Sequence, residues 1–441
     1  FDVVTWTGDG SAGPFTLSHN LGSSVGMSTV KVTSHAGNWI TNHRSVPTQY
    51  LTLDTSYSAQ TDVTMTSTDS TITFNGSNVY YNSSGRTYVA YLFADNSAED
   101  AEDQMIKCGS FTTDASGNAT VSLGWEPQYI LRKQSDGADY WNLADSMRGF
   151  NTVNTASLYP NVSNGEYSGS TLHVPTADGF EVTATTPNAT FIYMAIRAPM
   201  MVEPEAATDV FDVAMSLNPA WPTFISSFPV DMSIHKDTTA GTSINGARLV
   251  QDRKLEMNSV AAEGSGNTEM MYNFMNGFYK PIAYGSPPGG IGGTAFVGYM
   301  WKRAKGYFDV VPYTGNGVSG RTVAHSLGVA PEMIWVKSRS FAYNWLVMPN
   351  DATKYAYLNY PNGASVNSAF WLDTDPTSTE FTVSANAQVN GSAKTYIAYL
   401  FASLAGISKV GNYTGNGSYQ TIDCGFAAGS RFILIKRTDA T

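Results

Sequence analysis

Charged residues are scarce in this 441-residue chain. Asp, Glu, Lys and Arg together make up 14% of the sequence, against about a quarter in an average globular protein. The 36 acidic residues outnumber the 25 basic ones, which leaves a net charge of −11. Nucleic-acid binders need a basic surface to neutralise phosphates, and anionic membranes attract clusters of Lys and Arg. The composition therefore argues against nucleic acids and anionic membrane surfaces as partners.

Long apolar runs and cysteines are also lacking. No uninterrupted apolar stretch approaches ~18 residues, the length that indicates a membrane-spanning helix, so we expect no membrane insertion. The two cysteines, Cys108 and Cys424, are too few for a disulfide scaffold or a four-cysteine zinc site. In the repeats described below they lie opposite Val410 and Leu123, which predicts buried free thiols.

Catalytic motifs are missing as well. The sequence contains no HExxH, GxSxG or phosphate-binding loop. His19 and His325 occupy equivalent places before a Leu-Gly turn, where hydrogen bonding within a loop is the expected role. We therefore expect a non-enzymatic protein with no cofactor and no bound metal. A dispersed Ser/His/Asp triad or a pair of catalytic carboxylates would leave no signature in the sequence, so both remain open.

What the chain has in abundance is internal repetition. FDVVTWTGDG at 1–10 matches FDVVPYTGNG at 308–317 in seven of ten positions. RTYVAYLFA at 86–94 matches KTYIAYLFA at 394–402 in seven of nine. A second pattern returns when KCGSF at 107–111 is followed, late in the chain, by KVGNY at 409–413. Fixed-period similarity of this kind indicates tandem copies of one structural unit.

The repeats divide the chain into five parts, for which we use letters. They are β-sandwich unit A (1–96), β-sandwich unit B (106–199), β-rich unit C (200–306), β-sandwich unit A′ (307–403, a repeat of A) and the start of unit B′ (409–441, a truncated repeat of B). Because a third of a repeat cannot bury its own core, we expect the natural chain to continue beyond B′.

Each unit has the pattern of short β-strands joined by tight turns. Apolar and polar residues alternate at 71–74 and 380–383, which is the period of a half-buried strand. Asp9-Gly10 and Asn316-Gly317 are dipeptides that tolerate positive φ in hairpin turns. The sequence predicts an all-β protein built of tandem antiparallel β-sandwich units in a repeat array. One helix candidate, at 268–279, reads equally well as a strand or a loop.

Aromatic residues are frequent in the last strand of each unit and in its loops. The last strands of A and A′ alternate aromatic and small residues, which predicts that Tyr91 and Phe93, with their equivalents Tyr399 and Phe401, are largely buried. Trp39, Trp141 and Trp345 recur at matching positions. Their recurrence favours packing over stacking on sugar rings. The tyrosines that A and A′ do not share are the better candidates for a glycan or partner surface: Tyr80, Tyr81, Tyr355, Tyr357 and Tyr360.

The repeat motifs resemble those of a known protein family. FDVVxYTGxGxxGRTVxHSLGVAPEMIWVKSRS at 308–340, TYIAYLFAS at 395–403, KVGNYTGNG and IDCGFAAGSRFILIKRTDAT within 409–441, and IYMAIRAP at 192–199 are similar to virion structural proteins of marine tailed bacteriophages, including cyanophages and pelagiphages. The resemblance covers nearly the whole chain and is weakest across 200–306. It implies a component of an extracellular virion and carries over no catalytic residue.

Together these features predict a structural component of a phage particle, in the form of a tail fibre or another external appendage involved in host attachment. The alternatives are a carbohydrate-binding surface adhesin and a capsid-surface decoration protein. Unpaired strand edges with few charges favour a homo-oligomer, and phage appendages with three-fold symmetry suggest a trimer. Other virion proteins and host surface glycans are the remaining expected partners.

Overall fold

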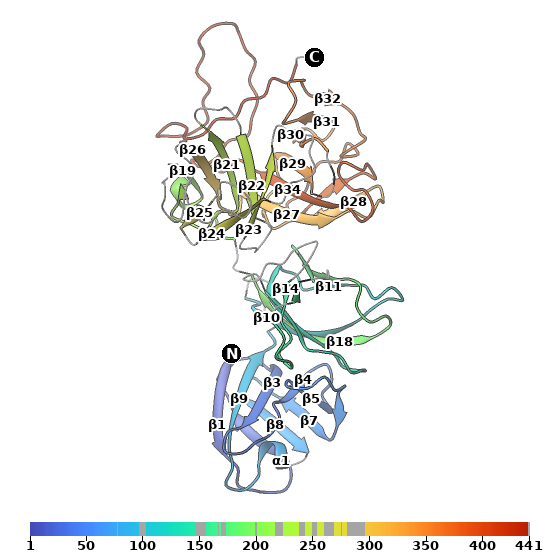
Figure 1. The fold of residues 1–441 in the computed structure, drawn as a ribbon. Coiled ribbons are helices and arrows are strands. Elements are labelled where there is room, and N and C mark those ends of the chain that lie inside the picture. The colour runs from blue at the N-terminus through green and yellow to red at the C-terminus, as the bar shows by residue number, and fades with distance from the viewer. Residues whose placement is uncertain are drawn as a thin grey trace. The chain divides into compact units, whose positions relative to one another are not determined.

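The computed structural model consists of two compact regions, residues 1–199 and 200–441, each of which is described by itself (Figure 1). The structure describes residues 1–76, 78–96, 103–145, 156–165, 167–168, 173–198, 201–216, 224–237, 243–248, 254–259, 269–274, 276–279, 296–339, 341 and 343–439. The chain is nearly all β, with 2% in helices, which confirms the predicted class. No helix among the described residues is long and apolar enough to cross a membrane.

Unit A is formed by two antiparallel sheets that enclose a core. The larger sheet has the strand order β1 (Asp2–Thr7), β9 (Thr87–Ala94), β3 (Val25–Val32), β4 (Ile40–His43), β5 (Gln49–Thr52) and β6 (Gln60–Thr61). The smaller sheet has the order β2 (Phe15–Ser18), β8 (Thr71–Gly76) and β7 (Val63–Ser67), and the short helix α1 (Asn78–Tyr81) follows it. Val30, Leu92 and Phe74 meet in the core between the two sheets.

Unit B repeats this arrangement with fewer strands. Its larger sheet has the order β10 (Ile106–Thr112), β18 (Thr190–Arg197), β12 (Pro127–Gln134) and β13 (Asn142–Asp145). Its smaller sheet has the order β11 (Ala119–Ser122), β17 (Gly179–Val182) and β16 (Val174–Thr176), and a separate pair joins β14 (Ala156–Ser157) to β15 (Tyr167–Ser168). Ile130, Phe180 and Tyr193 join the two sheets in one core.

The second region contains units C and A′. The C sheet follows the short 3-10 helix Ala207–Asp209 and has the order β19 (Phe211–Met215), β26 (Phe296–Trp301), β21 (Met232–Asp237), β22 (Ser243–Arg248), β23 (Lys254–Ser259), β24 (Glu269–Phe274), β25 (Gly277–Tyr279) and β20 (Phe224–Ile225). The larger sheet of A′ has the order β27 (Phe308–Thr314), β34 (Thr395–Phe401), β29 (Met333–Ser338), β30 (Leu346–Pro349), β31 (Lys354–Tyr357) and β32 (Ser365–Val366). Its smaller sheet consists of β28 (Arg321–Ala324) and β33 (Glu380–Val383). The described part of the helix candidate at 268–279 is therefore a pair of strands.

One strand arrangement recurs in the largest sheet of each of the four units A, B, C and A′. The last strand of each unit lies between its first and third strands, so β9, β18, β26 and β34 are central although they come last in the sequence. The same aromatic pair fixes the register in the sandwich units. Trp6 faces Tyr88, Phe111 faces Phe191, and Tyr313 faces Tyr396. The rings of each pair stack with centroids 5.2 to 5.3 Å apart.

The TGxG motif after the first strand is explained by backbone crowding. A Cβ atom on Gly8 would lie 2.3 Å from the carbonyl oxygen of Ser83, and one on Gly315 would lie 2.2 Å from that of Gly391, so no other residue fits at either position. Gly10 and Gly317 have φ of +75° and +71°, as expected for the predicted turn dipeptides.

The two faces of the closing strand differ in how far they are buried. In A, the alternate residues Tyr88, Ala90 and Leu92 face the core, whereas Tyr91 and Phe93 lie on the outer face and are half-buried. Tyr91, Phe93 and Phe401 are therefore partly buried rather than part of the core between the two sheets. Tyr399 is buried as expected, because residues of unit C cover the outer face of the A′ sheet.

Residues 409–439 form no strand, although 409–413 and 432–434 match β10 and β12 of unit B. The pairing in B gives the physical reason. β10 and β12 form no ladder with each other, since each pairs with an edge of β18. Residues 409–441 contain no counterpart of β18, so the two matching segments have no strand to pair with.

Units A and B pack together through the outer faces of their larger sheets. Met27 and Leu51 of A form one buried cluster with five residues of B, among them Trp141. The Trp141 indole donates a hydrogen bond to the Thr52 carbonyl oxygen over 2.8 Å. His43 Nε2 lies 3.0 Å from the Tyr193 carbonyl oxygen. These contacts make units A and B one continuous packed body.

The boundary between A and B also contains an ion pair and a thiol. Arg44 pairs with the buried Asp95 carboxylate, and Asp95 Oδ1 accepts a hydrogen bond from the Cys108 backbone amide over 3.2 Å. Cys108 is a buried free thiol, as expected, and burial raises its pKa to about 12. Cys424 is partly exposed, so the expectation of burial is wrong for that residue, which lies in the strandless segment 409–439.

We predict that Leu92→Ala lowers the free energy of unfolding by about 2–5 kcal/mol, because the side chain is fully buried in the middle of the central strand. Urea denaturation of the full chain measures this. Val3→Ala is the matched control in the neighbouring strand β1, where the side chain is 46% exposed and little loss is expected. Equal losses for the two variants would contradict the assignment of faces.

We further predict that acidification destabilises the N-terminal region through His43. Burial, opposed by the hydrogen bond to Tyr193 and assisted by Arg44, lowers the pKa of His43 to about 4, whereas an unfolded histidine has a pKa of about 6.5. The unfolded chain therefore binds more protons between these values. The stabilising contribution is complete above pH 6.5 and is lost as the pH falls toward 4, by about 3 kcal/mol.

Urea denaturation at a series of pH values measures this loss. His43→Met should flatten the profile between pH 6.5 and 4, and His35→Met, at an exposed histidine, should leave it unchanged. His173 contributes a residual slope of the same sign, because burial and the nearby Arg132 lower its pKa. A His43→Met profile that matches the unsubstituted protein would contradict the prediction.

Candidate functional site

Unit B carries polar residues at two core positions that are apolar in units A and A′. The units can be aligned on the residue that pairs with the first aromatic of the closing strand, which is Tyr88, Phe191 or Tyr396. Two residues before that partner stand Val30 in A, Arg132 in B and Val336 in A′, so these three positions are equivalent. The neighbour of Arg132 across the sheet, Asn142, corresponds to Ile40 and Leu346. All six side chains are buried. Unit B has therefore exchanged a pair of aliphatic core residues for an arginine and an amide.

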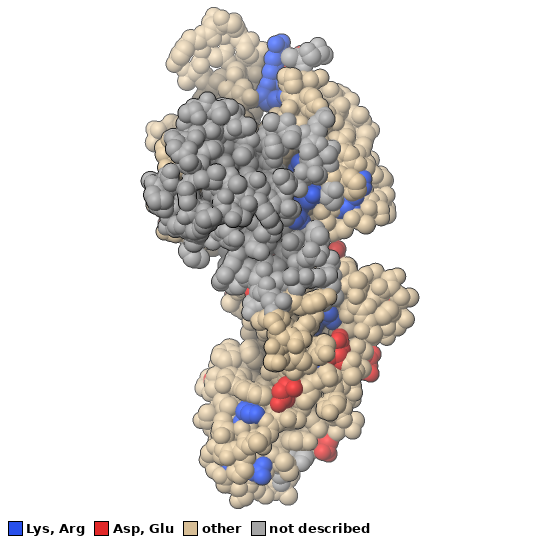
Figure 2. Space-filling view, in the orientation of Figure 1, with Lys and Arg blue, Asp and Glu red and all other residues tan. Residues whose placement is uncertain are grey.

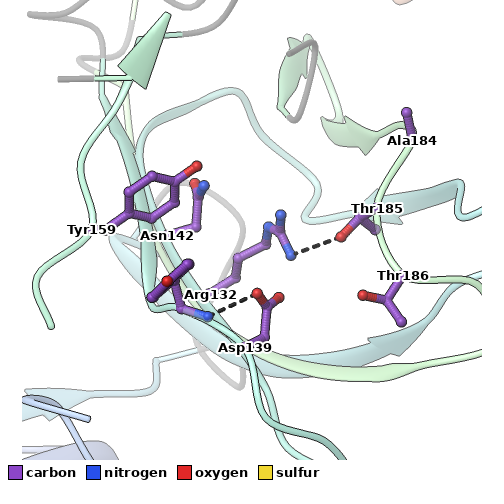
Figure 3. A pocket seen from close by; sticks show the side chains of 8 residues that line it. Arg132, Asp139, Asn142, Tyr159, Ala184, Thr185 and Thr186 are labelled. Carbon is purple, nitrogen blue, oxygen red and sulfur yellow. Dashed lines mark hydrogen bonds between the residues drawn. The ribbon is translucent and has the colours of Figure 1, made fainter. Parts of the chain in front are cut away.

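These two polar side chains line a pocket of about 250 Å³. Figure 3 shows the Arg132 guanidinium crossing the pocket toward Thr185, with Asn142 and Tyr159 on one side and 184–186 on the other. The strands β12 and β13 supply the floor, and loop residues supply the walls. The complete lining among the described residues is Arg132, Asp139, Tyr140, Asn142, Tyr159, Ala184, Thr185 and Thr186.

Arg132 is fixed from three directions. Its Nε donates to His173 Nε2 over 2.8 Å, and a terminal nitrogen donates to Thr185 Oγ1 over 3.4 Å. The guanidinium also lies over the Phe191 ring, 4.7 Å from its centroid, which is a favourable cation–π geometry. Burial lowers the pKa of Arg132 to about 10, and the charge of Asp139 opposes this shift. The side chain thus stays charged at neutral pH and is held in one orientation.

Asn142 provides a hydrogen-bonding group that no described residue uses. Its side chain is almost completely buried, and its Oδ1 atom has no hydrogen-bond partner. A buried amide without a partner costs about 1–3 kcal/mol. Since Ile40 and Leu346 occupy the same position elsewhere in the chain, the fold itself does not require a polar residue here. The exchange therefore points to a ligand rather than to folding.

Tyrosines form the rim of the pocket. The Tyr140 and Tyr159 rings lie 5.3 Å apart, and Tyr167 continues the row at 6.0 Å from Tyr159. Tyr140 and Tyr167 are about half exposed, whereas Tyr159 is partly buried, and this burial raises its pKa. The rim thus offers flat aromatic surfaces beside the polar floor.

The tyrosines singled out in the sequence lie in other places. Tyr81 is buried, stacks on Phe74 at 4.3 Å and donates to Asn42 Oδ1, so it is a core residue of A and cannot belong to a surface. Tyr80 is half-buried, and its hydroxyl lies 3.1 Å from that of Tyr50. The structure does not bring these two tyrosines into the pocket of unit B.

The tyrosines of A′ form a small cluster of their own. Tyr355 and Tyr357 pack against the A′ core, and Tyr360 adjoins Tyr357 with ring centroids 6.0 Å apart. Tyr360 is the most exposed of the three. Its role in a partner surface, together with that of Tyr355, Tyr357 and Tyr80, stays a prediction.

Other sequence-based expectations concern packing and hydrogen bonding. Trp141 and Trp345 are buried in clusters between neighbouring units, which confirms the packing role, and Trp39 stacks on Tyr91 at 6.0 Å. His19 and His325 each accept a hydrogen bond at Nδ1 from the amide two residues later, as expected for a loop role. The described residues contain no cluster of three or more His, Cys, Asp or Glu that is placed to hold a metal ion.

Comparison with known proteins places the chain in a family. A family model described as "Domain of unknown function (DUF7483)" matches residues 1–199 and 302–441. The chain belongs to the DUF7483 family. The first DUF7483 segment contains units A and B and thus the whole pocket, and almost all of unit C lies between the two segments. No curated protein matches the chain.

The sequence contains a signal for this pocket that motif searches miss. A lysine follows the exchanged position in each of the three sandwich units A, B and A′: Lys31, Lys133 and Lys337. Each donates to a carbonyl oxygen of the loop after its strand, at Gly37, Gly137 and Tyr343 respectively. Aligning the units on this lysine would have set Arg132 against Val30 and Val336. The polar exchange would then have been visible without a structure.

We predict that Arg132→Met combined with Asn142→Leu changes the free energy of unfolding by less than about 2 kcal/mol. The gain from burying apolar in place of polar groups is offset by the loss of the hydrogen bond that Arg132 donates to His173. Urea denaturation of the full chain measures this. Arg132→Ala is the contrasting control, since it leaves a cavity and should cost about 2–5 kcal/mol. A loss above ~2 kcal/mol in the double variant would show that the polar pair serves folding.

Proposed function

We propose that the chain is a non-enzymatic structural component of a bacteriophage particle, in a tail fibre or another external appendage that takes part in host attachment. The observation that carries the proposal is the repeated use of one sheet arrangement, in which one of the three sandwich units, B, differs from A and A′ by holding a polar pocket. Tandem units add length and surface, and one altered unit adds recognition. The resemblance of the repeat motifs to marine phage virion proteins supports the same conclusion.

The surface is compatible with a particle component. Figure 2 shows a face on which Lys, Arg, Asp and Glu are few and separated among the described residues. Serine, threonine and asparagine supply hydrogen-bonding groups instead, which suits contacts with neighbouring subunits, other virion proteins and glycans. The described residues on this face form no broad basic area of the kind that nucleic-acid binding needs.

The pocket supports binding rather than catalysis. Asp139 is the one carboxylate among the eight described residues that line it. Glycoside hydrolysis by the usual route needs two carboxyl groups that flank the scissile bond. Binding without turnover is therefore the better explanation of the lining. The same pocket favours a carbohydrate-binding surface adhesin as the second candidate function, and a capsid-surface decoration protein is the third.

Antibody labelling of intact particles tests the virion assignment. Gold particles at the tail or at appendages would support the first function, and labelling spread over the head would support capsid decoration. Absence of the chain from purified particles, with the chain exposed on bacterial cells, would favour the adhesin and overturn the phage assignment.

We predict that the full chain forms a homo-oligomer, with a trimer as the expected form, and that strand β1 contributes to it. β1 pairs with β9 on one side and with no described strand on the other, and its Val3 side chain is exposed. Unpaired edges of this kind invite pairing with another chain. Light scattering at micromolar concentration measures the mass. Val3→Asp should lower the mass, and Val318→Asp, at an exposed valine in a loop, should not. A single-chain mass for the unsubstituted protein would contradict the prediction.

A further inference from the structure

We infer that the pocket of unit B binds one uncharged sugar ring, through Arg132 and Asn142 on its floor, Asp139 in its wall and Tyr140 and Tyr159 on its rim. The inference deepens the proposed function and rests on it, because it names the class of ligand that an attachment protein would recognise through this unit. It follows from the size, the hydrogen-bonding groups and the charge of the pocket.

Size sets the first limit on the ligand. Pockets for drug-sized molecules have volumes of about 300–1,000 Å³, and a water molecule takes about 30 Å³. At about 250 Å³ the pocket has room for more than water and for less than a typical drug-sized ligand. A single six-membered sugar ring fits between these limits, with the rest of a glycan left outside.

The hydrogen-bonding groups call for a ligand that both donates and accepts. The Arg132 guanidinium can only donate, the Asp139 carboxylate can only accept, and the Asn142 amide can do both. Oδ1 of Asn142 is buried without a partner and is best satisfied by a donor. A sugar hydroxyl donates one hydrogen bond and accepts others, so neighbouring hydroxyls on one ring can satisfy all three side chains.

Charge argues against an anion. Asp139 is close enough to Arg132 to raise its pKa electrostatically, so the guanidinium is already partly balanced. A carboxylate or phosphate would be repelled by Asp139, and it would bring no donor for Asn142. A cation would be repelled by the fixed guanidinium. An uncharged polyhydroxyl ring meets neither obstacle.

The rim completes the match. One face of a sugar ring presents C–H groups that pack on flat aromatic rings, and Tyr140 and Tyr159 lie side by side at the pocket with the outer ring about half exposed. The polar floor would then take the hydroxyls while the tyrosines cover the C–H face. Units A and A′ have aliphatic residues at the floor positions, so the inference does not extend to them.

Saturation-transfer NMR with the full chain and three probes, methyl glucoside, methyl galactoside and methyl mannoside, tests the inference. We expect at least one of them to bind with a dissociation constant in the millimolar range. Asn142→Leu should weaken that binding about tenfold or more, because the buried hydrogen bond is lost. Tyr140→Ala should weaken it about 2–10-fold. Tyr419→Ala, at an almost fully exposed tyrosine outside unit B, is the control and should have no effect.

Two further arms make the outcome decisive. Methyl glucuronoside has the ring of methyl glucoside with a carboxylate added and should bind more weakly; tighter binding would overturn the assignment to an uncharged ligand. Tyr140 is a surface residue, so its variant keeps the test valid if Asn142→Leu fails to fold. Absence of binding by all three neutral probes, or binding unaffected by Tyr140→Ala, would overturn the inference. Antibody labelling of virions tests the proposed function separately, so failure of sugar binding and failure of the virion assignment can be told apart.

Discussion

The pairing of the closing strand with both of its neighbours is the interaction on which every unit depends. β9, β18, β26 and β34 come last in their units and yet lie in the middle of their sheets, so no sheet can form until its final residues arrive. This explains why the closing motif is among the most similar segments between A and A′. It also explains residues 409–439, where the counterparts of β10 and β12 have no central strand and form no sheet. Pairing of this kind joins residues far apart in the sequence, which favours slow folding of whole units over stepwise growth.

The pairing of the closing strand is the same in every unit, but it does not determine which residues lie on the outer face of the sheet. In A, the outer face packs on B through Met27 and Leu51, with His43 and Arg44 as polar contacts. In A′, the positions of His43 and Arg44 are taken by Pro349 and Asn350, and residues of unit C cover the sheet instead. The same strands thus support different neighbours, because the contacts that choose the neighbour lie on the face that the core does not use.

Sequence patterns predicted the class of fold because its causes are local. Alternation with a period of two, turn dipeptides such as Asp9-Gly10, and the repeated motifs each act within a few residues. The face of Phe93 could not be predicted in this way, because it depends on the register with β3 and on what packs outside the sheet. The pocket was missed for a related reason. Arg132 and Asn142 are ten residues apart, and only the β12–β13 pairing makes them neighbours. Tyr81 was misjudged because a difference between A and A′ was read as exposure, whereas it reflects a different core around Phe74.

The location of the polar pair has a consequence for binding. Arg132 and Asn142 lie on strands rather than loops. The Arg132 guanidinium packs on Phe191 of the closing strand, which pairs with β10 on one side and β12 on the other. Groups that are already immobile lose little conformational entropy when a ligand arrives, so even a small site can bind usefully. The rim residues Tyr140 and Tyr159 come from loops, which tolerate substitution more readily than strands. A family that keeps the sheet and varies these loops could alter ligand preference without disturbing the fold, because the strand that holds the sheet together also holds the floor of the pocket.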